Sequence, residues 1–124
     1  MGKITIKGSL PGTNDIIDAA KKGRGNYQPY SIMKAEYTDM IGWIAKQLPK
    51  YGRVDIAITW YEPNLRRDPD NITGGGTKFI LDGLVAAGVI KDDSHRYINS
   101  ISHRYKLDRK EPRIEVIVKE AEEE

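Results

Sequence analysis

Residues 54–60 carry the most restrictive pattern in this chain, because a large apolar side chain occupies every second position. These residues are Val54, Ile56, Ile58 and Trp60. Successive side chains of a strand point to opposite faces, so the pattern predicts a strand over 53–62 with one buried face. Residues 3–7 alternate in the same way and end at Gly8, which predicts an earlier strand. Each buried strand face needs another layer to pack against it.

Helical periodicity occurs in two other segments. From Ser31, a suitable N-cap, apolar residues recur three or four positions apart until Pro49, which predicts a helix with one apolar face. A second helix is predicted over 77–87, with Gly88 as its C-cap. The segments 9–30 and 63–76 are rich in glycine, proline and short polar residues, and we interpret both as loops. The apolar face of the first helix is assigned to the core: Met33, Tyr37, Ile41, Ile44 and Leu48.

Two further strands are predicted over 97–107 and 113–119, with Pro112 between them. Together the segments predict an α+β fold. It is a single small domain with a mixed β-sheet of about four strands and two helices packed against the sheet. We expect the domain to span residues 1–119 and residues 120–124 to form an acidic tail.

Composition narrows the class of protein. A chain of 124 residues is long enough for one domain. It contains no cysteine, which excludes disulfides and thiolate zinc sites. No apolar run approaches the roughly 18 residues that span a bilayer, and the N-terminus lacks the apolar core of a signal peptide. We therefore expect a cytoplasmic protein with no membrane partner.

The net charge of +2 hides an asymmetry between the tail and the rest of the chain. Four of the eighteen acidic residues lie among the last five, so in residues 1–119 the twenty basic residues outnumber the acidic ones by six. Such an excess attracts polyanions, because each neutralised phosphate releases a condensed counterion. A solvated basic surface with an acidic tail for solubility is the alternative.

Acidic residues concentrate in the second half of the chain. Asp68 and Asp70 are two positions apart just after a predicted strand, so in an extended segment their side chains point the same way. Their mutual repulsion is relieved by a hard divalent cation such as Mg²⁺ or Mn²⁺. Asp92 and Asp93 follow the second helix. The turn after the second helix could bring Asp93 to the strand end that carries Asp68 and Asp70. The spacing of these residues alone does not decide whether it does.

These residues belong to a longer pattern. R-D-P-D-N at 67–71 is followed by K-x-x-x-D-x-L at 78–84 and by D-D at 92–93. The pattern resembles the RusA family of Holliday junction resolvases, over residues 66–93. L-P-G-T-N at 10–14 is similar to the N-terminal loop of that family. Six residues separate Asn71 from Lys78, which is more than the commonest spacing in the family. This longer spacing affects the position of Lys78 relative to the acidic residues.

The resemblance implies a metal-dependent endodeoxyribonuclease that resolves four-way junctions by symmetric phosphodiester hydrolysis in DNA recombination and repair. It implies a homodimer and Mg²⁺ as cofactor, with Mn²⁺ as a substitute. Carried over residue by residue, it puts catalytic and metal-binding carboxylates at Asp68, Asp70 and Asp93, and a basic catalytic helper at Lys78. Asn71 and Asp92 take supporting roles. Candidate phosphate contacts are Lys21, Lys22, Arg24, Arg66, Arg67, Arg96, Arg104, Lys106 and Arg109.

Other interpretations remain open. The chain is alternatively a non-catalytic module that binds branched DNA, or a nuclease acting on flaps or forks. The D-P-D-N segment is also typical of turns, in which Asp and Asn bond their own backbone. The glycines at 74–76 are interpreted as a flexible linker that opens the second helix. His95 and His103 are expected at the surface, and Trp60 in the core. The remaining aromatic candidates for stacking on unpaired bases are Tyr27, Tyr30 and Tyr61.

Overall fold

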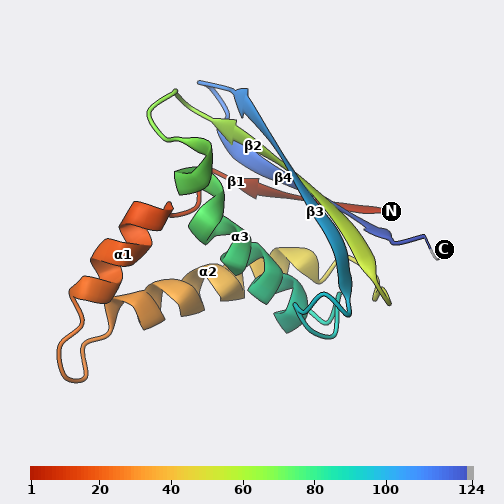
Figure 1. Ribbon diagram of the computed structural model, residues 1–124, viewed down its shortest axis with the longest axis horizontal. Coiled ribbons are helices and arrows are strands. Elements are labelled where there is room, and N and C mark those ends of the chain that lie inside the picture. The colour runs from red at the N-terminus through yellow and green to blue at the C-terminus, as the bar shows by residue number, and fades with distance from the viewer. Residues whose placement is uncertain (123–124) are drawn as a thin grey trace.

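The computed structural model (Figure 1) describes residues 1–122 and contains one four-stranded mixed sheet. The strands are β1 (Gly2–Lys7), β2 (Val54–Glu62), β3 (Ile98–Leu107) and β4 (Arg113–Glu120). Their order is β1-β4-β2-β3. β2 runs parallel to β3, whereas β4 is antiparallel to both β1 and β2. The predicted α+β fold with a mixed four-stranded sheet is confirmed.

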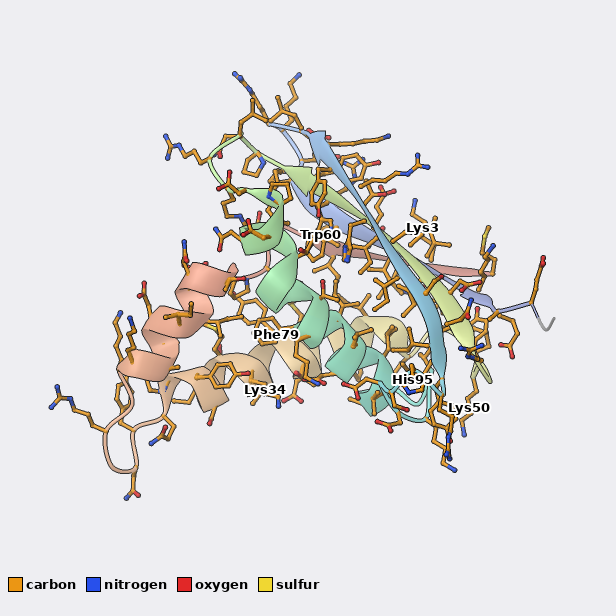
Figure 2. The ribbon with its side chains drawn as sticks, in the orientation of Figure 1. Lys3, Lys34, Lys50, Trp60, Phe79 and His95 are labelled. Atoms are coloured by element: carbon orange, nitrogen blue, oxygen red, sulfur yellow. The ribbon has the colours of Figure 1, made fainter. Side chains whose placement is uncertain are left out.

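Three helices cover one side of the sheet (Figure 1) and leave the other side open: α1 (Thr13–Lys21), α2 (Pro29–Ala45) and α3 (Pro69–Ala86). The core lies between these layers and takes every second residue of β2. Figure 2 shows Trp60 and Phe79 in this layer, and both are almost completely buried. The indole Nε1 of Trp60 donates a hydrogen bond to Nδ1 of His103 (3.0 Å). Burial lowers the pKa of His103, so its ring is favoured in the neutral form that accepts this bond.

The prediction that residues 9–30 form a loop is wrong, because they contain the nine-residue helix α1. A helix this short is marginal in isolation, so its own sequence pattern is weak and tertiary contacts hold it. Ile16 packs against α3 at Gly75, where an added Cβ would lie 2.1 Å from Cδ1 of Ile16. The sequence therefore predicted two helices, whereas residues 1–122 contain three.

The predicted start of α3 is also wrong, because the helix begins at Pro69 and not at Thr77. Asp68 is its N-cap residue and Pro69 occupies the first turn, where a missing N–H costs nothing. The three glycines at 74–76 are thus inside the helix and are not a linker. Each lowers helix propensity by about 1 kcal/mol, but each also allows close packing, and an added Cβ at Gly76 would lie 2.9 Å from the Trp60 ring. α2 also starts earlier than predicted, at Pro29.

The C-terminal boundary differs by one residue from the predicted one. β4 continues to Glu120, whose carboxylate accepts the backbone N–H of Gly52 at 3.1 Å. Glu120 therefore belongs to the sheet and not to an acidic tail. The last two residues of the predicted tail, 123–124, lie outside the described part of the chain. Within residues 1–122, none of the helices has the length and apolar character needed to cross a membrane.

Candidate functional site

The two motif segments singled out in the sequence meet at the N-terminus of α3. Asn71 accepts the backbone N–H of Asn14 with its Oδ1 atom (3.1 Å), and Thr13 donates its hydroxyl to the carbonyl of Asp70 (3.3 Å). α1 begins after Gly12, which has no side chain to cap the helix. Asn71 supplies the missing acceptor from another element, so its supporting role is to cap α1 and to fasten it to α3.

Asp68 and Asp70 are both exposed at this end of α3. The segment before them is held by Arg67, whose guanidinium makes two hydrogen bonds to the carboxylate of Glu62 (2.8 and 2.9 Å). A third bond joins Arg67 to the carbonyl of Leu10 (2.9 Å). Glu62 is buried. Arg67, predicted to contact phosphate, is therefore engaged inside the molecule, and the exposed cation beside the acidic pair is Arg66.

Lys78 and Asp93 form a separate cluster farther along α3. The Nζ atom of Lys78 lies 2.6 Å from Oδ2 of Asp93 and 3.1 Å from Oδ1 of Asp82. Hydrogen bonding to Asp93 raises the pKa of Lys78, and the same bond lowers the pKa of Asp93. Asp92 supports the turn by accepting the backbone N–H of Asp93 (2.8 Å). Asp82 was missed as a member, although it lies four positions after Lys78 on one helix face.

The predicted convergence of Asp68, Asp70 and Asp93 does not occur within one chain. In residues 1–122 there is no group of three or more His, Cys, Asp or Glu side chains arranged to hold a metal ion. The reason is the early start of α3: Lys78 follows Asp70 by eight positions of the helix, a rise of roughly 12 Å. Asp93 pairs with Lys78 and therefore lies farther along α3, away from Asp70. Figure 1 shows the N-terminus of α3 and the turn that follows the helix at opposite ends of α3.

Cationic side chains gather on the open face of the sheet, at the end where β2 leads into α3. The strand register sets Lys7, Arg113, Tyr61 and Lys106 in one row across all four strands. Arg104 follows in the next row. The predicted contacts Arg104 and Lys106 thus share a surface, to which the register adds Lys7.

Arg113 anchors the middle of this row. Its guanidinium carbon lies 3.7 Å from the centre of the Tyr61 ring, and it forms ion pairs with Asp108 (2.8 Å) and Glu115 (2.9 Å). The hydrogen bonds that its guanidinium donates to Glu115 and to Asp108 raise the pKa of Arg113. Arg113 is thus internally paired, whereas Lys106 faces the Tyr61 ring at 5.9 Å and remains exposed. Arg109 is exposed in the turn that leads into β4.

The other predicted phosphate contacts lie away from this face. Lys21, Lys22 and Arg24 are exposed at the end of α1 and in the loop that follows, and Arg96 is exposed in the turn before β3. Figure 1 shows these two places apart from the β2–α3 loop. Only part of the predicted set therefore surrounds the acidic pair.

Comparison of the chain with protein-family models and with curated proteins found no match.

Proposed function

We propose that this chain is a metal-dependent endonuclease that resolves four-way DNA junctions as a homodimer. The observation that supports the proposal is the adjacency of acid and base at the N-terminus of α3, where the exposed Arg66 stands two positions before the exposed Asp68. DNA phosphates drawn to the cationic row would lie next to the acidic pair. A two-fold dimer would present two equivalent sites to the two symmetric strands of a junction. In this proposal the protein works in the cytoplasm, on DNA.

The donor set at this end suits Mg²⁺. In proteins Mg²⁺ is usually held by one or two carboxylates, with water and substrate phosphates completing its shell. Asp68 and Asp70 would hold it, and the bound ion would supply an activated water and neutralise charge on the phosphate. Three carboxylates do not meet here, because the length of α3 separates Asp93 from Asp68 and Asp70. The chain's own residues would do the rest: Arg66 and Lys106 bind phosphate, while the Arg67–Glu62 pair positions Asp68.

The test is cleavage of a mobile synthetic four-way junction in Mg²⁺ or Mn²⁺, with a chelator as the blank. We expect paired nicks at symmetric positions. Asp70→Asn should abolish nicking and leave junction binding intact or tighter, because a negative charge facing phosphate is removed. Asp39→Asn, at an exposed aspartate on α2, is the matched control and should cut normally. Loss of binding together with cutting in Asp70→Asn would make Asp70 a structural residue.

A second candidate function is a non-catalytic module that binds branched DNA. It is favoured by the absence, in residues 1–122, of a three-ligand metal group. This candidate predicts that the chain binds the junction but does not nick it in Mg²⁺ or Mn²⁺. It also predicts that Asp70→Asn does not change what the chain does to the junction. A nuclease specific for flaps or forks is separated from both by competition between junction, flap and linear duplex in the cleavage assay.

A further inference from the structure

The face of the sheet that the helices leave open (Figure 1) is strongly cationic along its whole length. Successive side chains of a strand alternate between the two faces, so the strand register assigns every second residue to the open one. Six of these residues are cationic: Lys3, Lys7, Arg104, Lys106, Arg113 and Lys119. Two are acidic, Asp55 and Glu115, so the open face has a net charge of +4, above the +2 of the whole chain.

The two acidic residues of the open face already have partners. Glu115 pairs with Lys3 (3.2 Å) and with Arg113 (2.9 Å), and Asp55 accepts a hydrogen bond from the hydroxyl of Ser100 (2.6 Å). The other four cations of the face are exposed and form no ion pair with a carboxylate in residues 1–122: Lys7, Arg104, Lys106 and Lys119. Their charge is therefore available to an anion from outside the chain.

The composition of the open face does not suit a second packed layer. A sheet face that packs on another layer is lined by large apolar side chains, as the inward positions of β2 are. The outward positions of β2 and β3 instead hold mostly small or polar residues: Asp55, Ala57, Thr59, Tyr61, Ser100, Ser102, Arg104 and Lys106. Two copies of the chain stacked through this face would also repel each other, because both carry positive charge there. The partner that fits is a polyanion.

The aromatic content of the open face favours a duplex over a single strand. Tyr61 is the only aromatic residue that the strands place there, and the guanidinium carbon of Arg113 lies 3.7 Å from the centre of its ring. Single strands bind by stacking their bases on accessible rings, which this face does not offer. The exposed hydroxyls of Thr5 and Ser102 lie among the cations. Hydroxyl and cationic side chains contact the sugar–phosphate backbone, so the face suits the outside of a duplex.

The cations extend far from the acidic pair at the N-terminus of α3. Lys106 is paired with Tyr61 in the register, whereas Lys119 is paired with Asp55, six positions earlier on β2. Six strand residues span roughly 20 Å. One strand of a DNA duplex places about six phosphates over that length. The cationic row beside α3 is thus one end of a longer surface.

We infer that one duplex arm of the DNA lies along the open face of the sheet, held through its phosphates from Lys106 to Lys119. The inference rests on the DNA-binding part of the proposed function and adds a surface that leads away from the acidic pair. Phosphate contacts carry no sequence information, so binding to this face is independent of base sequence. A solvated basic face without a partner is the alternative that the test excludes or establishes.

The experiment measures binding of a short linear duplex in chelator, as the slope of log K against log salt concentration. Each phosphate contact that is lost reduces the magnitude of this slope by about 0.9. Lys119→Gln should therefore reduce it by about 0.9, and Arg104→Gln/Lys119→Gln by about 1.8. The reductions should be the same for two duplexes of unrelated sequence.

Lys46→Gln/Lys50→Gln is the matched control, because Lys46 and Lys50 are exposed cations at the end of α2, in the helix layer. It removes the same charge as Arg104→Gln/Lys119→Gln and should keep the wild-type slope. An unchanged slope in Arg104→Gln/Lys119→Gln would overturn the inference and leave a solvated face. An equal reduction in the control, or tighter binding of a single strand than of the duplex, would also overturn it.

Failure of this inference is distinguishable from failure of the proposed function, because the binding assay contains neither a junction nor a metal ion. The expected slopes without any nicking of a junction in Mg²⁺ would contradict only the nuclease. Nicking of the junction by a protein whose slope does not depend on Arg104 and Lys119 would contradict only the duplex surface.

Discussion

The ammonium of Lys78 lies 2.6 Å from a carboxylate oxygen of Asp93 and ties the middle of α3 to the turn that follows this helix. The resemblance predicted Asp93 as a catalytic and metal-binding carboxylate and Lys78 as a basic catalytic helper. Their pairing instead leaves each with a local partner, and Asp82 adds a second carboxylate to the same ammonium at 3.1 Å.

The Lys78–Asp93 ion pair should contribute to the free energy of unfolding only while Asp93 is ionised and Lys78 is protonated. The pKa of Asp93 is lowered from 3.8, so the contribution is complete above 3.8 and lost as the pH falls through the lowered value. The pKa of Lys78 is raised from 10.5, so the contribution is complete below 10.5 and lost as the pH rises through the raised value. Lys78 is half exposed, so we expect a coupling energy of at most about 1 kcal/mol.

A double-mutant cycle with Lys78→Met and Asp93→Asn, measured by urea unfolding at pH 7 and at pH 3, checks this. The coupling should be present at pH 7 and reduced at pH 3. Asp92→Asn, which leaves the ion pair in place, should not couple to Lys78→Met. A coupling that is equal at both pH values would contradict the assignment.

Asn71→Ala should lower the free energy of unfolding by about 1 kcal/mol, because the N–H of Asn14 in the first turn of α1 loses its side-chain acceptor. The bond concerned joins Oδ1 of Asn71 to the backbone N–H of Asn14 (3.1 Å). Asn14→Ala keeps that N–H and is the control. Chemical denaturation of the two variants should therefore give different results, and an equal loss in both would rule out a capping role.

Two glycines face each other where α2 crosses α3, and they should respond differently to alanine. A Cβ at Gly83 would lie 2.7 Å from Cβ of Ile41 and 3.1 Å from the backbone nitrogen of Gly42. A Cβ at Gly42 meets nothing closer than 3.4 Å. Gly83→Ala should cost about 1–3 kcal/mol through overpacking, whereas Gly42→Ala should be neutral or stabilising by up to about 1 kcal/mol. Thermal unfolding of both variants tests this, and a stable Gly83→Ala protein would show that the helices separate easily.

Arg67→Met should destabilise the protein by about 3–5 kcal/mol, because it leaves the buried carboxylate of Glu62 without its cation. The double variant Glu62→Leu/Arg67→Met should recover most of this loss. Arg66→Met should stay within about 0.5 kcal/mol of wild type but weaken junction binding. Urea unfolding and a salt titration of binding separate these roles, and a fully stable Arg67→Met protein would return Arg67 to the candidate phosphate contacts.

Segments with a clear alternating or helical pattern of apolar residues were predicted well from the sequence. The alternation at 54–60 and the helical spacing from Met33 to Leu48 identify β2 and α2, because each records which side of one element is buried. The four-stranded sheet follows from such patterns. The acidic residues and their order along the chain were also visible, because a motif depends only on residue types and spacing.

Tertiary packing decided the features that the local sequence patterns did not indicate, namely α1, the start of α3 and the separation of the carboxylates. α1 and the first two turns of α3 were taken for loops, since a nine-residue helix and a run of three glycines have little helix propensity of their own. Packing of Ile16 and Trp60 against those glycines compensates. The same lengthening of α3 carries Lys78 and Asp93 away from Asp70. Helix propensity is local, whereas the distance between two carboxylates depends on where every intervening element begins.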